Sequence, residues 1–127
     1  MAAASVLDTS FIVAFFDEQD ARHASARKAM AAARPAILGP EALVETLGVI
    51  KVKAGRIAAG AALEALVRLP NLQWDERSDI LGSWRLQRQN PALSFVDAAV
   101  VACALRHRVG LLTYDHGQAR VAKRLGK

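Results

Sequence analysis

Short apolar runs alternate along the chain with longer segments of helical period. The short runs predict buried strands at residues 5–7, 36–38, 72–74 and 110–114. The longer segments predict helices at residues 10–16, 22–33, 41–52, 56–68, 76–89, 94–108 and 116–125. Short apolar strands separated by helices are typical of an α/β fold. We therefore expect a short, mostly parallel central sheet of about four to five strands, flanked by helices.

The composition fits one folded domain spanning residues 1–127. Hydrophobic residues make up 53% of the chain, enough for a core without disulfides or a structural metal. The single cysteine, Cys103, excludes a disulfide within the chain and a cysteine-based zinc site. The longest apolar run, residues 98–105, is far shorter than the roughly 20 residues of a membrane span. Because Asp8 interrupts the stretch that a signal peptide would need, we expect a cytoplasmic protein with no membrane segment.

Four acidic residues occupy unusual positions in this pattern. Asp8 follows the first predicted strand and Asp115 follows the last, and ligands of open parallel sheets bind beyond the carboxyl ends of the strands. Asp97 lies in the first turn of a predicted helix that is apolar on all sides over residues 98–105. An ionised carboxylate on such a surface is costly unless it is paired or bound to a metal. Glu45 also lies on a helix with no clean polar face around it.

Helix capping is the competing interpretation for three of these acids. Asp8 and Asp115 each precede a predicted helix, where an aspartate commonly accepts backbone N–H bonds. Asp97 stands three residues after Ser94, which is the spacing of a capping box. Taken singly, each is more often a cap than a ligand. Capping does not require the acids to converge, however, whereas a parallel sheet would bring all three to one edge, and Glu45 has no capping explanation.

A divalent cation would explain why carboxylates gather at one edge. Clustered carboxylates repel one another, and Mg²⁺ or Mn²⁺ relieves the repulsion through oxygen ligands. Two such ions about 3.5–4 Å apart can activate water and stabilise the leaving oxygen in phosphodiester cleavage. The chain has 17 Lys and Arg against 12 Asp and Glu, a net charge of +5. This basic excess fits a phosphate-bearing polymer as the substrate.

The four acids lie in segments with a recognisable order. They are Val6-Leu7-Asp8-Thr9-Ser10, Leu43-Val44-Glu45-Thr46-Leu47, Phe95-Val96-Asp97-Ala98 and Leu111-Leu112-Thr113-Tyr114-Asp115. Each segment alone is a weak signal, but the four in this order resemble the motifs of the PIN domain family, specifically the VapC-type toxins of type II toxin–antitoxin systems. The resemblance spans nearly the whole chain, from Val6 to the final helix.

The resemblance implies a single PIN domain with the activity of a Mg²⁺- or Mn²⁺-dependent endoribonuclease. It further implies an RNA substrate, a homodimer and a cognate antitoxin that covers the acidic groove. The residues that would hold the metal are Asp8, Glu45, Asp97 and Asp115. Thr113 and Ser10 would orient water, metal ligands or substrate. Asp115 is the most replaceable of the ligands and would act through water.

The chain departs from the family pattern after its last acid. Relatives often carry an aromatic residue a few positions beyond this aspartate, whereas His116-Gly117-Gln118 follows here. This difference leaves the geometry of the Asp115 loop open. Residues 53–93 match no motif, and we expect selectivity for substrate or antitoxin to reside there.

The remaining chemistry-bearing residues have ordinary structural interpretations. A basic stripe on the last helix fits a solvated face near a helix C-terminus better than it fits RNA contact: Arg120, Lys123, Arg124 and Lys127. Arg106-His107-Arg108 ends its helix in the same way. The histidines lack the paired spacing of a zinc site: His23, His107 and His116. Cys103 is expected to be a small buried side chain, and Trp74 and Trp84 to anchor the core or an interface.

Three other classes of function fit parts of the pattern. A phosphoaspartate enzyme or receiver domain also places an aspartate after its first strand. The second aspartate of a phosphatase and the lysine of a receiver are missing, because Ser10 and Asp115 stand in their places. A catalytically silent binding module and a PIN nuclease of RNA processing retain the fold and differ in activity or in partner.

Overall fold

A four-stranded parallel sheet organises the structure, which is a computed structural model that describes residues 3–126. The strand order is β3-β2-β1-β4, and every pair of neighbours is parallel. The strands are β1 (Ala3–Leu7), β2 (Ala33–Leu38), β3 (Leu72–Trp74) and β4 (Gly110–Leu112). The helices are α1 (Thr9–Phe16), α2 (His23–Ala32), α3 (Pro40–Ala54), α4 (Arg56–Arg68), α5 (Ile80–Gln89), α6 (Phe95–His107) and α7 (His116–Leu125). The predicted α/β fold with a parallel central sheet is confirmed.

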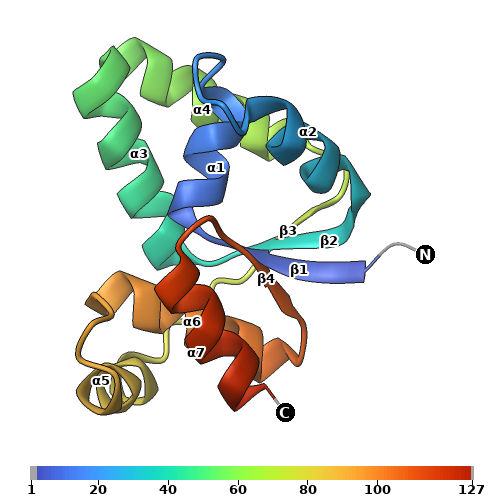
Figure 1. Cartoon of the computed structure of the whole chain (residues 1–127). Coiled ribbons are helices and arrows are strands. Elements are labelled where there is room, and N and C mark those ends of the chain that lie inside the picture. Colours follow the sequence, from blue (N-terminus) through green and yellow to red (C-terminus); the bar gives the residue numbers. More distant parts are fainter. Residues whose placement is uncertain (1–2, 127) are drawn as a thin grey trace.

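The core lies on both faces of this sheet. Figure 1 shows α1 to α4 on one side of the sheet and α5 to α7 on the other. Val6 and Leu7 of β1 are buried, as are Phe11 and Ile12 in the helix that follows. Full burial of a side chain as large as Phe11 stabilises a fold by about 1.5–3 kcal/mol. This packing fixes the end of β1, from which the chain enters the candidate site.

Strand β2 begins three residues earlier than the apolar run predicted. Its first residues pair with β1 through an irregularity, because Ala3 faces Ala33 and Ser5 already faces Ala36. Pro35 lies inside this irregularity, where its missing N–H costs the ladder no regular hydrogen bond. The boundary is therefore determined by pairing with β1 rather than by the local pattern.

The end of β4 and the start of α5 also differ from the prediction. Strand β4 ends at Leu112 rather than at residue 114, because the backbone N–H of Tyr114 donates to Ser10 Oγ (2.9 Å) and leaves the sheet. Helix α5 begins at Ile80 rather than at residue 76, and the Asp79 side chain caps it by accepting from the Gly82 N–H (2.9 Å).

The break between α3 and α4 falls where the sequence placed it. Gly55 has φ +96°, a conformation that side chains with a Cβ rarely adopt. Its N–H donates to the Lys51 carbonyl (2.9 Å) and closes α3. Among the helices within residues 3–126, none has the length and apolar character of a membrane span.

The two tryptophans lie on the surface. Trp74 is 39% exposed and Trp84 is 47% exposed, so the expectation that they anchor the core is wrong. The guanidinium carbon of Arg88 lies 4.9 Å from the centre of the Trp84 ring. The interface alternative for both residues stays a prediction.

Candidate active site

The Asp8 carboxylate is buried and held by several hydrogen bonds. Asp8 follows β1, caps α1 and is only 2% exposed. Its Oδ2 accepts hydrogen bonds from the Ser10 N–H (3.1 Å) and from the Ser10 hydroxyl (2.7 Å), and it lies 2.9 Å from Thr113 Oγ1. Its Oδ1 accepts from Gln118 Nε2 (3.1 Å). Both oxygens of this buried carboxylate are thus held in fixed positions by neighbouring donors.

Two hydroxyls connect Asp8 to the end of β4. The Ser10 hydroxyl donates to Asp8 and accepts from the Tyr114 N–H. Thr113 Oγ1 accepts from the Asp115 N–H (3.0 Å) and lies 3.2 Å from Ser10 Oγ. Because the β4 carbonyl at Leu112 also accepts the Asp8 N–H (3.0 Å), the two strand ends form one unit. Ser10 and Thr113 therefore hold the Asp8 carboxylate against the loop after β4, and their predicted role toward a metal, water or substrate stays a prediction.

Asp97 lies close enough to Asp8 and Asp115 for their negative charges to raise its pKa. It forms the predicted capping box, in which Asp97 N–H donates to Ser94 Oγ (3.0 Å) and Ser94 N–H donates to Asp97 Oδ2 (3.3 Å). Burial raises the pKa of Asp97, the bonds from Ser94 lower it, and the negative charges of Asp8 and Asp115 raise it again. The net pKa lies above the ordinary value of 3.8. Three aspartates from three different elements therefore share one electrostatic environment.

The capping interpretation is confirmed for all three aspartates, and their role as metal ligands stays a prediction. Asp115 caps α7 by accepting the Gln118 N–H at Oδ1 (3.0 Å), just as Asp8 caps α1 and Asp97 completes the box of α6. Caps place these acids at helix N-termini, where the partial positive charge of each helix favours an anion. The parallel sheet then brings the three N-termini to the same edge.

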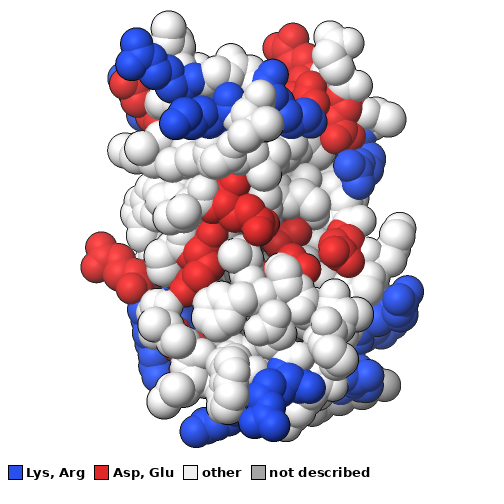
Figure 2. All heavy atoms as spheres, turned by 90° about the vertical axis from the view of Figure 1, so that its left-hand side faces the viewer, with Lys and Arg blue, Asp and Glu red and all other residues white. Residues whose placement is uncertain are grey.

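Glu45 stands apart in the contacts of the site. It lies half-buried on α3. Among the hydrogen bonds and ion pairs within residues 3–126, none joins it to the three aspartates. Figure 2 shows acidic side chains gathered across the middle of one face, with basic side chains above and below them. The place of Glu45 in the ligand set stays a prediction.

Comparisons with known proteins agree with this geometry. The model of the PIN domain family matches residues 5–124. The chain belongs to the PIN domain family. The crystal structure of Mycobacterium tuberculosis VapC20, described as a Sarcin-Ricin loop cleaving toxin, superposes with a TM-score of 0.77. It shares 23% sequence identity over 92% of this chain and 94% of that chain, and this likeness supports the fold. The comparison with curated proteins found no match.

Gln118 is a site residue of this PIN domain that the sequence interpretation missed. It is fully buried, and its Nε2 donates both to Asp8 Oδ1 and to the Asp97 carbonyl (3.2 Å). Its Oε1 lies 2.8 Å from Thr113 Oγ1, whose single hydroxyl proton can be donated either to this oxygen or to Asp8 Oδ2. One side chain therefore connects three parts of the site. The signal was the departure after Asp115, where a polar residue stands near the position at which relatives often carry an aromatic one.

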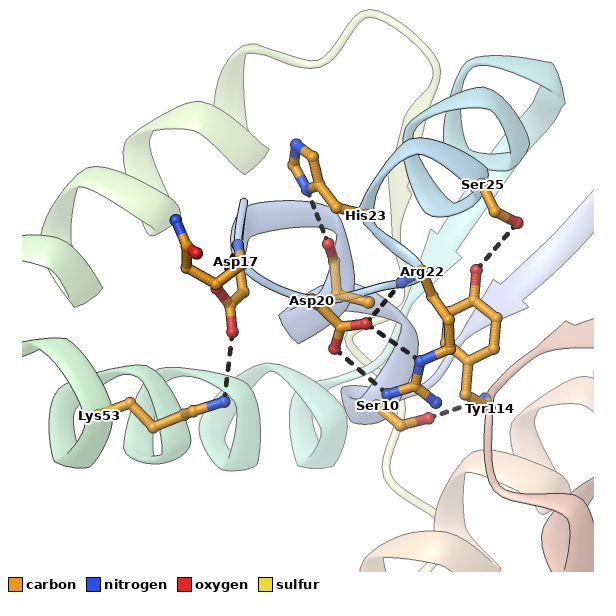
Figure 3. Close-up of polar contacts among 10 residues, drawn as sticks. Ser10, Asp17, Asp20, Arg22, His23, Ser25, Lys53 and Tyr114 are labelled. Atoms are coloured by element: carbon orange, nitrogen blue, oxygen red, sulfur yellow. Dashed lines mark hydrogen bonds and ion pairs between the residues drawn. The ribbon is translucent and has the colours of Figure 1, made fainter.

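The loop that carries Asp115 is also held from the outside. Figure 3 shows Tyr114 between the start of α1 and the loop before α2. The Tyr114 ring stacks against Phe11 (centroids 5.8 Å apart), and the Arg22 guanidinium lies 4.5 Å from its centre. Arg22 in turn pairs with Asp20 (3.1 Å). The Tyr114 hydroxyl donates to Ser25 Oγ (3.4 Å). This packing supplies the loop geometry that the sequence left open.

A second polar cluster of the PIN domain joins the chain after β3 to α6. Asp75 Oδ2 accepts from the Cys103 thiol (3.3 Å) and from Arg106 Nη2 (2.5 Å), and it lies 2.8 Å from His107 Nε2. Burial, followed by the bond to Asp75, raises the pKa of the Cys103 thiol to about 12. The carboxylate, thiol and imidazole have the proximity of metal ligands. The guanidinium already supplies positive charge to the shared oxygen, so we interpret the cluster as a polar clamp.

The clamp corrects two expectations. Cys103 is buried as predicted, but its thiol has a polar partner rather than only apolar neighbours. The sequence predicts solvated cations at this helix end, whereas Arg106 and His107 both contact Asp75. The clamp holds the loop after β3 against α6, and it thereby supports the helix whose first turn carries Asp97.

The clamp predicts an acid-dependent loss of stability. Burial alone would raise the pKa of Asp75, but hydrogen bonds from His107, the Arg77 N–H, Arg106 and Cys103 together hold it well below 3.8. A depressed folded-state pKa stabilises the protein above the unfolded value and loses this contribution as pH falls below it. Asp75→Asn should therefore lower the free energy of unfolding by about 1–3 kcal/mol at pH 7. The difference from wild type should shrink below pH 3.8.

Urea denaturation between pH 2.5 and 7 measures this difference. Glu76→Gln is the matched control, because it removes a neighbouring acid that is exposed. A pH-independent difference between wild type and Asp75→Asn, or an equal loss in Glu76→Gln, contradicts the clamp.

Proposed function

We propose that this PIN domain is a Mg²⁺- or Mn²⁺-dependent endoribonuclease that acts as the toxin of a toxin–antitoxin pair. The observation that carries the proposal is the convergence of Asp8, Asp97 and Asp115 on one sheet edge. The family to which the chain belongs and the fold it shares with a VapC toxin support the same activity.

The donor set fits a hard divalent cation. The ligands on offer are carboxylate oxygens, and the charges of Asp8 and Asp115 raise the pKa of Asp97, so the acids repel one another. A cation bound by these three aspartates, with Glu45 as a further ligand, removes that repulsion. When bound, such an ion supplies positive charge that activates water and stabilises the leaving oxygen of a phosphodiester.

The residues around the acids hold the Asp8 carboxylate in a fixed orientation. Ser10, Thr113 and Gln118 hold the Asp8 carboxylate through both oxygens, so it is oriented before a ligand arrives. Preorganised polar groups contribute to catalysis because they need no rearrangement during the reaction. Asp115 is exposed at the rim of the site, where it is accessible to water and to a substrate.

Exposed apolar side chains support protein partners, which we propose to be a second copy of the chain and a cognate antitoxin. Large exposed side chains on α3, α4 and α5 include Val44, Val52, Ile57, Val67, Ile80 and Leu81. Val52 is 88% exposed and Ile57 is 83% exposed, on either side of the Gly55 break. Exposed apolar side chains that gather on neighbouring helices favour protein interaction surfaces.

Metal removal tests the proposed activity. Protein treated with EDTA should leave single-stranded RNA intact, and addition of Mn²⁺ or Mg²⁺ should restore cleavage. The same addition should raise the melting temperature, because a ligand that binds only the folded state stabilises it. Gel electrophoresis of the RNA and a thermal melt provide the two readouts. If the metal produces neither cleavage nor a thermal shift, the catalytically silent binding module is favoured instead.

A growth experiment separates a toxin from a nuclease of RNA processing. Expression of the chain should arrest growth, and co-expression of its cognate antitoxin, which a toxin–antitoxin pair would encode in an adjacent reading frame, should relieve the arrest. Metal-dependent cleavage without growth arrest would favour the processing nuclease.

A further inference from the structure

A cavity opens directly beside the acidic cluster. It has a volume of about 700 Å³ and lies between the α5–α6 connection and α7. Its lining includes Asn90, Leu93, Asp115, Arg120, Lys123 and Arg124. Asp115 thus belongs both to the candidate metal site and to this cavity. A ligand that extends away from the acids past Asp115 would enter the cavity.

The charge of the cavity is concentrated on one wall. Arg120, Lys123 and Arg124 are exposed and follow one face of α7. Arg124 Nη2 reaches across and donates to Asn90 Oδ1 (2.6 Å), which ties the two walls together. Arg120 and Lys123 form no ion pair among residues 3–126. They are therefore available to an anionic ligand.

The helix dipole does not account for the whole basic stripe. Lys123 and Arg124 lie in the last turn of α7, where cations are favoured by the C-terminal dipole, as the sequence interpretation proposed. Arg120 lies in the middle of a ten-residue helix, beyond the reach of that effect. Lys127, the last member of the predicted stripe, lies outside the described residues. The C-terminal dipole therefore does not account for Arg120.

We propose that this cavity binds an RNA backbone phosphate that flanks the scissile one, with Arg120 as its principal contact and Lys123 as its second. The inference rests on the proposed ribonuclease function and adds a subsite to it. Arginine suits this role because its planar guanidinium can donate two parallel hydrogen bonds to a phosphate.

The lining favours backbone recognition over base recognition. The residues that surround the cavity include no aromatic side chain on which a base could stack. Contacts to phosphate fix the register of a strand and carry no sequence information. The subsite should therefore strengthen the binding of all single-stranded RNA sequences alike.

Salt-dependent RNA binding tests the subsite without cleavage. The affinity of wild type, Arg120→Ala and Arg120→Lys for a single-stranded RNA oligonucleotide would be measured in EDTA by fluorescence anisotropy across a salt series. Arg120→Ala should weaken binding about three- to tenfold at low salt and reduce the slope of log K against log salt by about 0.7, the value of one phosphate contact. Arg120→Lys should keep the slope. Arg68→Ala is the matched control, because Arg68 is exposed and ends α4 just before β3, at the opposite edge of the sheet.

Cleavage kinetics separate failure of the subsite from failure of the proposed function. In Mn²⁺, Arg120→Ala should raise KM and leave kcat near the wild-type value. If wild type binds and cuts RNA while Arg120→Ala matches Arg68→Ala in affinity and slope, the subsite is wrong and the nuclease stands. If wild type neither binds nor cuts RNA, both proposals are wrong.

Discussion

Asp97→Asn is expected to abolish RNA cleavage while leaving the metal-free protein at least as stable as wild type. The substitution removes one of the three converging charges, and we expect kcat/KM to fall by about 10²–10³-fold. The asparagine oxygen can still accept the Ser94 N–H, so the cap of α6 is retained. The pKa of Asp97 lies above its unfolded value, so ionisation of this group lowers folding stability as pH rises through the folded pKa. At pH 7 the neutral amide avoids that cost.

Two measurements on the same protein samples check this expectation. Single-turnover cleavage in Mn²⁺ gives the rate, and thermal unfolding in EDTA at pH 7 gives the stability. Glu64→Gln is the control, because it removes an exposed acid of α4. If Asp97→Asn cleaves RNA at the wild-type rate, Asp97 serves only as a helix cap. A loss of activity accompanied by an equal loss in Glu64→Gln would point to net charge rather than to the site.

The order of elements was predictable because local patterns determine it. Each strand is a short apolar run, and the Gly55 break and the Asp8, Ser94 and Asp115 caps are visible in the sequence. The convergence of Asp8 and Asp115 followed from one general rule, that the carboxyl ends of parallel strands meet at one edge. Asp97 is not covered by that rule, because α6 follows α5 rather than a strand. Much of the candidate site was therefore accessible before the structure.

The start of β2 was predicted wrongly because distant residues determine it. The side-chain amide of Asn71 donates to the carbonyls of Met30 (2.8 Å) and Ala33 (2.7 Å). It thereby satisfies the end of α2 and the start of β2, which the sequence placed three residues later. No local periodicity could show this contact, since it joins residues that are about forty positions apart.

The polar clamp was not predicted, because it also depends on contacts between residues far apart in the sequence. Cys103 and His107 are one turn apart on α6, but Asp75 lies 28 and 32 positions before them. Asp75 follows the edge strand β3, and its approach to α6 depends on how the sheet packs against that helix. The sequence indicated a buried thiol and a helix-end cation, and only the fold placed a carboxylate between them.

Gln118→Leu is the second substitution with a large expected effect, and its signature differs from that of Asp97→Asn. Leucine approximates the volume of glutamine but removes the donor to Asp8 Oδ1 and to the Asp97 carbonyl. Loss of a residue that orients a metal ligand typically costs about 10–100-fold in metal affinity or activity. The three aspartates remain, so a higher Mn²⁺ concentration should restore cleavage in Gln118→Leu, whereas it should not rescue Asp97→Asn.

A Mn²⁺ titration followed by both cleavage and melting temperature distinguishes this positioning role from simple packing. A packing defect would lower the melting temperature in EDTA and leave the Mn²⁺ midpoint unchanged, because the ligands would keep their orientation in the folded fraction. A positioning role shifts the midpoint to higher Mn²⁺. Gln73→Leu, an exposed change on β3, should match wild type in both measurements. An unshifted midpoint in Gln118→Leu would show that Ser10 and Thr113 alone suffice to orient Asp8, since they hold its other oxygen.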